Sequence, residues 1–186
     1  MFLSGAETEA YFKKLESLLK LPRADSQLFQ AIVNAPFHNR PNTTLMGLGI
    51  VVLLLVDKQQ NLIRRIALSE TEPAKGAVDY SVKPFKEIVI PVDFKGNFIA
   101  EAIRSGRYQQ TSDWQYLFAP DLSPEEARLN QSGAGVGCSF VYPLNQARDG
   151  GALIFSYFIM LDRINTKHRD FMYRYAKLVS AVLEKK

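Results

Sequence analysis

The sequence feature that most constrains the fold is a long apolar hairpin between Gly133 and Phe158. Two apolar runs, Val136–Leu144 and Ala152–Met160, flank a polar turn at Asn145–Gly151. The runs are rich in Val, Ile, Phe and Tyr, which favour strands, and the turn holds Asn, Asp and glycines, which favour tight reversals. We therefore expect two adjacent antiparallel strands at the centre of a sheet.

A third apolar run, Leu45–Val56, adds another strand to this sheet. Its residues are almost continuously apolar, which is typical of a strand that is covered on both faces. After a polar turn the chain returns through Leu62–Ser69, a more polar segment that we expect to form an outer strand. Shorter strands are predicted at Lys86–Val92 and Arg107–Thr111, whereas Glu70–Pro84 shows no periodicity and is predicted to be a loop.

Apolar residues at helical spacing, together with capping signals, predict the helices. Residues 7–20 and 25–34 form two amphipathic segments, each followed by a proline that ends it. Further helices are expected at Gly96–Ser105, after Ser123 and over Thr166–Glu184. Because neighbouring strands are joined by short turns, these elements predict an α+β fold with an antiparallel sheet and helices packed on it.

The length and composition of the chain limit its class. Its 186 residues suffice for one well-packed domain, and 47% apolar with 23% charged residues are ordinary values for a globular protein. We therefore expect a single domain over residues 1–186, with a core over about 15–184. No apolar run is long enough to cross a membrane, and the N-terminus lacks the pattern of a secretory signal. We expect a cytoplasmic protein with no membrane partner.

Three segments, in their order along the chain, resemble a GAF domain, the small-molecule-binding sensory relative of the PAS domain. They are residues 51–68, 88–113 and 138–158, the last reading CSFVYPLNQARDGGALIFSYF. This last segment is similar to the "s.l.vPl...g..iGvl.l" hairpin of the family. The resemblance implies a six-stranded antiparallel sheet, with a pocket between the sheet and the helices or loops on one face.

The marked ligand classes of the GAF family are not matched by this chain. Bilin-binding members carry a Cys followed by a His, whereas Cys138 is followed by Ser139. Members that reduce free methionine sulfoxide need several cysteines, and this chain has one. The residues of the cyclic-nucleotide members have no counterpart, and haem would require His38 or His168 as its axial ligand. Since no cluster of metal-ligating side chains is visible either, we expect no bilin, haem or metal cofactor.

Aromatic residues after the helix at Gly96–Ser105 are the first candidates for ligand contact. The resemblance places this segment over the pocket as a lid, and the alternative is that the rings close the edge of the core. Alternate residues from Val136 to Tyr142 share one face of their strand and form a second group. In that group Cys138 is either a small buried hydrophobe or a redox sensor. The candidates are Tyr108, Trp114, Tyr116, Phe118, Cys138, Phe140 and Tyr142.

The last helix carries a second apolar stripe beside the one that packs on the sheet. Either the first helix covers this stripe within the same chain, or the stripe pairs with a second subunit or a signalling partner. His168, in the first turn of the last helix, is expected at the surface or at the rim of the pocket. The candidate residues for a dimer or partner contact are Tyr11, Leu15, Leu18, Met172, Val179 and Leu183.

These observations predict a sensory or regulatory module that binds a small metabolite, has no effector domain of its own and signals through its terminal helices. The alternative is a protein–protein interaction or dimerisation scaffold whose pocket is filled by its own side chains. A cavity of roughly 300 Å³ or more would favour the first. An enzyme is not expected, because no nucleophile–base pair or metal cluster can be assembled. A nucleic-acid partner is not expected either, because no helix-turn-helix, zinc finger or aromatic stacking motif is present.

Overall fold

The computed structural model describes residues 5–38, 46–145 and 150–185. At its centre is a six-stranded sheet in the order β3-β2-β1-β6-β5-β4, in which every adjacent pair runs antiparallel. The fold is therefore α+β, as predicted. The strands are β1 (Leu48–Asp57), β2 (Leu62–Leu68), β3 (Val89–Pro91), β4 (Gln109–Thr111), β5 (Cys138–Pro143) and β6 (Gly151–Tyr157).

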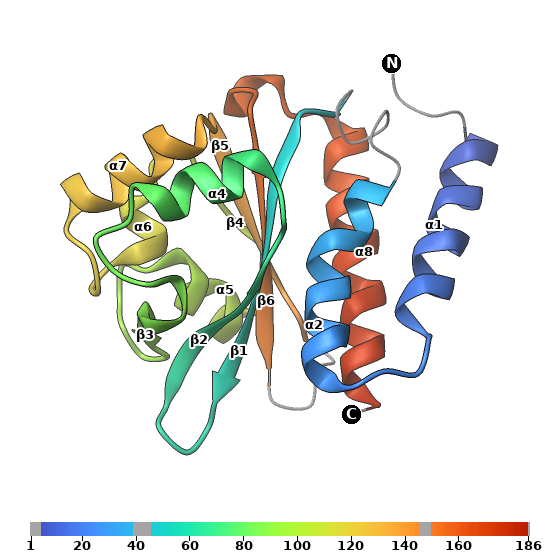
Figure 1. Cartoon of the computed structure of the whole chain (residues 1–186), viewed down its shortest axis with the longest axis horizontal. Helices are drawn as coiled ribbons and strands as arrows, with labels where there is room; N and C mark the ends of the chain where they lie inside the picture. The colour runs from blue at the N-terminus through green and yellow to red at the C-terminus, as the bar shows by residue number, and fades with distance from the viewer. Residues whose placement is uncertain (1–4, 39–45, 146–149, 186) are drawn as a thin grey trace.

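Helices cover both faces of the sheet (Figure 1). One face carries the terminal layer, which consists of α1 (Gly5–Leu19), α2 (Asp25–Asn34) and α8 (Thr166–Glu184), with α1 outermost. The other face carries the α4–α7 layer, which consists of α4 (Glu72–Asp79), α5 (Phe98–Ser105), α6 (Gln115–Phe118) and α7 (Pro124–Ala134). Within the described ranges, no helix combines the length and the apolar character that a membrane crossing requires.

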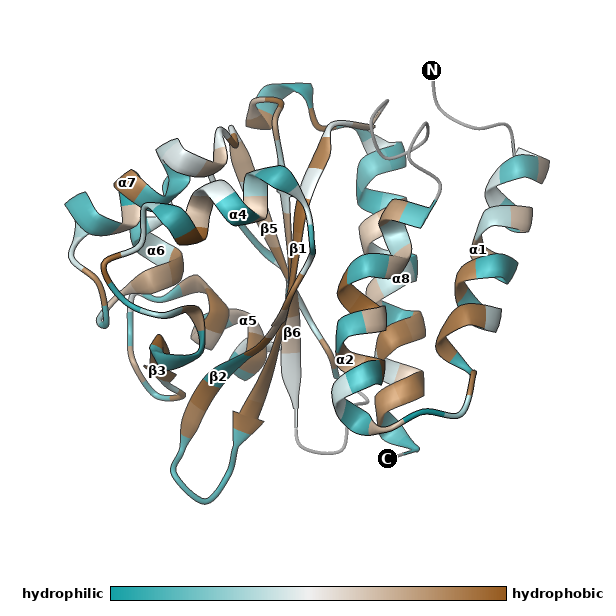
Figure 2. Ribbon diagram, viewed as in Figure 1, coloured by the Kyte–Doolittle hydropathy of each residue, from teal (hydrophilic) through white to brown (hydrophobic). Residues whose placement is uncertain are grey.

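The two central strands, β1 and β6, supply apolar side chains to both layers. In β1, Val51 and Leu53 are buried against the terminal layer, and Ile50 and Val52 are buried against the α4–α7 layer. Figure 2 shows the resulting band of apolar residues along the middle of the sheet. The prediction of a strand covered on both faces is confirmed. The hairpin of β5 and β6 contributes one of the two central strands.

The strand β2 is not the outermost strand on its side, because β3 pairs with its first three residues. Its pairing with β1 contains a bulge, at which Ile66 has no partner across the ladder. One extra residue reverses the alternation of side chains between the faces of a sheet. As a result Arg65 and Leu68, three positions apart, both face the α4–α7 layer, where they line the same cavity.

The predicted loop at Glu70–Pro84 is wrong, because this segment contains the helix α4. The Thr71 side chain accepts a hydrogen bond from the backbone N–H of Ala74 (3.4 Å) and donates one to the carbonyl oxygen of Gly49 in β1 (2.8 Å). Pro73 lies in the first turn of α4, where a missing N–H costs no helical hydrogen bond. The helix thus begins on a cap that also fixes it to the sheet. Most of the predicted turn at Asn145–Gly151 lies outside the described residues.

Candidate functional site

A cavity of about 40 Å³ lies between the sheet and the α4–α7 layer. Its floor is formed by apolar side chains of β1 and β6, and its roof by side chains of α4 and α6. A water molecule takes up about 30 Å³ in the liquid, so the space admits a group of only a few heavy atoms. The floor includes Ile50, Val52 and Ile154, and the roof includes Trp114, Leu117 and Phe118.

The Trp114 side chain closes the cavity next to β5 and β6. Its indole is 5% exposed, and its Nε1–H donates a hydrogen bond to Ser139 Oγ (2.8 Å). Ser139 Oγ is in turn hydrogen-bonded to Ser156 Oγ (2.7 Å), and Ser156 lines the cavity. The polar atom of the indole is therefore satisfied against the sheet, while its ring packs against Phe118 with a centroid separation of 5.5 Å.

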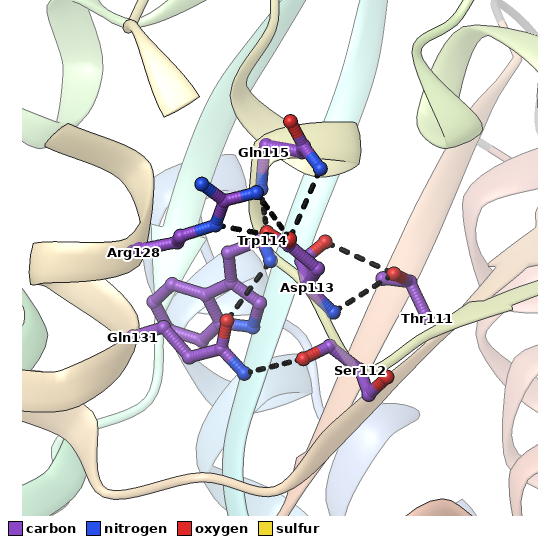
Figure 3. A network of polar contacts seen from close by, with 7 residues as sticks. All are labelled: Thr111, Ser112, Asp113, Trp114, Gln115, Arg128 and Gln131. Atoms are coloured by element: carbon purple, nitrogen blue, oxygen red, sulfur yellow. Dashed lines mark hydrogen bonds and ion pairs between the residues drawn. The ribbon is translucent and has the colours of Figure 1, made fainter. Parts of the chain in front are cut away.

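A polar network fixes the backbone on either side of Trp114 (Figure 3). The Trp114 N–H donates to Gln131 Oε1 (2.9 Å), and Gln131 Nε2 donates to the carbonyl oxygen of Ser112 (3.0 Å). Asp113 Oδ2 accepts hydrogen bonds from Arg128 Nε (3.0 Å) and Nη2 (2.8 Å). Gln131 and Arg128 both belong to α7, so this helix determines where the roof residue Trp114 lies.

The most unusual residue of the cavity is Arg65. Its side chain is 4% exposed; its Nη2 donates to the carbonyl oxygen of Leu117 (3.2 Å), and its Cζ lies 4.2 Å from the centre of the Phe118 ring. Within the described ranges its Nε–H has no hydrogen-bond partner. Burial lowers the pKa of Arg65 to about 10, partly opposed by the charge of Asp121. Arg65 therefore remains a cation at neutral pH.

The sequence did not single out Arg65. Two arginines stand side by side in LIRRIAL, and the segment as a whole has the polar character of an outer strand. Arg64 fits that picture, because its Nε lies 3.0 Å from Asp57 Oδ2 in a half-exposed ion pair. The inward orientation of Arg65 follows from the bulge at Ile66, and the residues of this segment contain no local pattern that predicts a bulge.

Of the predicted lid aromatics, Trp114 and Phe118 line the cavity. Tyr116 does not, since its ring is 39% exposed and stacks on Phe98 with a centroid separation of 4.8 Å. The structure thus brings two of the three lid candidates together and places the third on the outer surface of the layer.

The remaining ligand candidates lie on the other face of the sheet. Tyr108 and Tyr142 stack with a centroid separation of 5.3 Å in a groove of about 600 Å³ beside α8. Cys138 and Phe140 are buried in the core of the terminal layer. The expectation that Val136 shares their face is wrong, because it precedes β5 and packs in the other core. The cavity side of β5 carries Ser139 and Val141 instead, so a ligand in the cavity would not contact the face expected from the sequence.

The environment of Cys138 is that of a small buried hydrophobe. Its Sγ–H donates to the carbonyl oxygen of Ile159 (3.2 Å), and burial raises its pKa to about 11. Because the thiolate is the reactive form, we expect Ellman's reagent at pH 7.5 to modify the native protein at least about 1,000-fold more slowly than the unfolded chain. Stopped-flow absorbance with and without 6 M guanidinium measures this ratio. Rapid modification of the native protein would instead identify an accessible redox thiol.

His168 is not at the surface or at a pocket rim, contrary to the sequence-based expectation. It is 3% exposed and packs edge-on against the Tyr157 ring. Its Nε2 lies 2.9 Å from the carbonyl oxygen of Met46, so Nε2 carries the proton, and its Nδ1 accepts from the backbone N–H of Asn165 (3.3 Å). Burial lowers the pKa of His168. Its position is that of a helix-capping residue, and the described part of the chain contains no group of three or more side chains suited to hold a metal ion.

The residues proposed for a dimer or partner contact are covered within the chain. The Tyr11 hydroxyl donates to the carbonyl oxygen of Pro36 (2.8 Å), and the Tyr11 and Phe12 rings pack on Phe171 of α8. The apolar face of α8 is buried within the described chain, and α1 packs on this face at Phe171. Tyr11, Leu15, Met172, Val179 and Leu183 are all buried, and Leu18 is half-buried.

No protein-family model matches the chain, and no curated protein matches its sequence. Solved structures do match its fold over almost its whole length. The GAF domain from Acinetobacter phosphoenolpyruvate-protein phosphotransferase is similar at a TM-score of 0.64 and 8% identity, covering 98% of this chain and 95% of that one. The second GAF domain of DevS from Mycobacterium smegmatis is similar at 0.52 and 14% identity, covering 86% and 93%.

A third similar structure is the reduced form of fRMsr of Staphylococcus aureus, at a TM-score of 0.56 and 14% identity, covering 94% of each chain. At these identities the likeness concerns the fold alone, and a shared fold does not determine function.

Proposed function

We propose, for a chain that has the fold of a GAF domain, that it is a sensory or regulatory module that takes up a small molecule between the sheet and the α4–α7 layer. The observation that carries the proposal is the cavity itself. It combines an apolar floor with the buried cation of Arg65 and with Trp114, whose position is set by contacts from α7. Convergent polar groups in a mostly apolar pocket are typical of small-molecule sites.

Uptake of a ligand requires the roof to move. The cavity holds about 40 Å³, whereas ligand sites commonly span roughly 300–1,000 Å³. The roof is made of short helices, and α6 has only four residues. A ligand that binds a minor, opened arrangement of these helices more tightly would shift the population towards it. In this proposal the described structure is the closed conformation, and the conformation that binds the ligand is open.

The strand β6 provides a route from the cavity to the terminal helices. Ile154 and Ser156 line the cavity, and the alternating residues Phe155 and Tyr157 face the opposite layer. There the Phe155 ring meets Tyr175 of α8 at a centroid separation of 6.3 Å. A ligand that displaces β6 would therefore change how α8 packs, and α8 would present that change to a second subunit or a signalling protein.

The proposal is tested by the fluorescence of Trp114, the single tryptophan of the chain. Addition of the low-molecular-mass fraction of a cell extract is expected to give a saturable change in emission. Ala77→Leu, which adds side-chain volume at the cavity wall, should raise the half-saturating dose at least about fivefold, because extra methylenes forced into a packed interior typically cost about 1–3 kcal/mol. Emission that does not respond in the wild type would contradict ligand uptake.

A matched control separates filling of the cavity from the addition of a leucine. Ala181→Leu introduces the same side chain at a half-buried position of α8, on the opposite side of the sheet. Its half-saturating dose should equal that of the wild type. Equal doses for Ala77→Leu and the wild type would place any binding outside the cavity.

One observation favours a second candidate function, a protein-interaction scaffold with a filled pocket. The volume of 40 Å³ is well below the range of ligand sites, and the roof residues Trp114, Leu117 and Phe118 are all buried. In that case the fluorescence of Trp114 stays unchanged with every extract fraction, and the protein is recovered without any bound small molecule.

A further inference from the structure

We propose that Arg65 is an anion-binding residue and that the ligand presents a single carboxylate group to it and an apolar body to the rest of the cavity. The inference rests on the proposed function and adds the chemical class of the ligand. It is carried by the burial of Arg65, by the hydrogen bonds that already engage Asp121, and by the chemistry of the cavity walls.

Arg65 is a buried charge whose hydrogen bonding is incomplete. Its Nη2 donates to a neutral acceptor, the carbonyl oxygen of Leu117, and its Nε–H is unpartnered among residues 5–38, 46–145 and 150–185. Burial of a charged group is costly unless an opposite charge and further hydrogen bonds compensate for it. A bound anion at this position would supply both.

Asp121, the acid whose charge acts on Arg65, does not fill that role, because its carboxylate is already engaged. Lys83 Nζ lies 2.7 Å from Asp121 Oδ1 and 2.9 Å from Oδ2, and Oδ2 also accepts from the backbone N–H of Val89 (3.3 Å). Arg65, Lys83 and Asp121 together leave one positive charge uncompensated. One excess charge matches a carboxylate, whereas a phosphate dianion would bring a second negative charge into an apolar cavity.

The geometry around the guanidinium also suits a carboxylate. Phe118 and Phe85 lie near the guanidinium, with ring centres 4.2 Å and 5.8 Å from Cζ. Arginine stacked on aromatic rings keeps the in-plane N–H groups available for bidentate bonds to a carboxylate. The apolar residues Ile50, Val52 and Ile154 line the rest of the cavity, so they would contact an apolar body attached to that group.

The test compares carboxylic acids with their neutral amides. Thermal unfolding is followed with sodium acetate, isobutyrate and benzoate, with acetamide, isobutyramide and benzamide, and with sodium chloride and inorganic phosphate at equal ionic strength. In the wild type we expect at least one acid to raise Tm by about 3 °C or more at a concentration about ten times its Kd. The corresponding amide should not raise Tm at the same concentration. Titration calorimetry then gives the Kd of that acid.

Two variants assign the effect to Arg65. Arg65→Met removes the charge at similar volume, and its Kd for the acid should be at least about 30-fold higher than that of the wild type. Its Tm in the absence of ligand should be unchanged or higher, because a buried unpaired charge has been removed. Arg64→Met is the matched control, because it removes the neighbouring half-exposed arginine, and it should bind the acid as the wild type does. Should Arg65→Met fail to fold, Arg65→Lys takes its place, and its Kd for the acid should rise at least about tenfold.

Several results would overturn the inference. One is that an acid and its amide stabilise the protein equally, and another is that Arg65→Met binds the acid as tightly as the wild type does. A third is that phosphate stabilises the protein while the acids do not, and a fourth is that no acid stabilises it at all. The proposed function fails by a different observation, an unresponsive Trp114 with whole extract fractions. An extract that changes the emission equally in Arg65→Met and the wild type would preserve the proposed function and remove the anion site.

Discussion

Replacing Trp114 with alanine is expected to destabilise the protein by about 3–5 kcal/mol, the range measured for deletion of large buried aromatic side chains. The indole is 5% exposed, packs on Phe118 and donates its N–H to Ser139. The variant loses the contacts of the ring and leaves the Ser139–Ser156 pair without its donor. Chemical denaturation followed by circular dichroism measures the change. Since domains are stable by about 5–15 kcal/mol, the variant is expected to remain folded at low temperature.

A conservative variant separates the ring from its hydrogen bond. Trp114→Phe keeps most of the apolar contact and removes the N–H donor, so we expect a loss of only about 1–2 kcal/mol. If Trp114 lies in the wall of a ligand site, both variants should also weaken ligand binding, and alanine should do so more strongly. A Trp114→Ala protein as stable as the wild type would show that α6 does not close the core in solution.

Replacing Gly76 with alanine is expected to destabilise the protein by about 3 kcal/mol, because a Cβ at this position would clash with the carbonyl oxygen of Gly133 in α7. The reciprocal contact is similarly close, since a Cβ on Gly133 would lie 2.5 Å from the carbonyl oxygen of Gly76. Both contacts are made to backbone, so neither can be relieved by a side-chain rotation. The two helices would have to separate, which would open the α4–α7 layer over the cavity.

Whether Gly76→Ala lowers or raises the free energy of unfolding distinguishes close helix packing from an open helix surface. At an exposed helical position, alanine is about 0.8–1 kcal/mol more favourable than glycine. Gly5→Ala, at the exposed start of α1 with no atom within 4 Å of the added Cβ, is the matched control and should be neutral or slightly stabilising. The denaturation midpoints of both variants measure these changes in stability. A stabilising Gly76→Ala would show that α4 and α7 are not in close contact in solution.

The elements that could be predicted from the sequence are those with a local signal. The almost uninterrupted apolar run of β1 predicts a strand covered on both faces, and the apolar stripes of α2 and α8 predict two helices. The helix α4 could not be recognised from periodicity, because only Ala74 is fully buried in it and Gly76 serves close packing on α7. Its one local signal was Thr71 followed by Pro73, a common helix start.

The candidate site was predictable only in part, for a similar reason. The resemblance to GAF domains implied a lid that holds Trp114 and Phe118, and both residues line the cavity. Which face of β5 meets the cavity depends on how the sheet and helices are connected, and the two-residue period of a strand does not contain that information. Arg65 was missed because its direction depends on a bulge between two strands, a property of their pairing and not of either segment alone.

The measurement that tests the central claim most directly is native mass spectrometry of gently purified protein, compared with the mass of the denatured chain. If the cavity between the sheet and the α4–α7 layer takes up a small molecule, the native spectrum should contain a species with an excess mass that disappears on denaturation. That species should be depleted in Ala77→Leu and retained in Ala181→Leu. Native protein at the bare mass of the chain, with Trp114 emission that no extract fraction changes, would contradict the account.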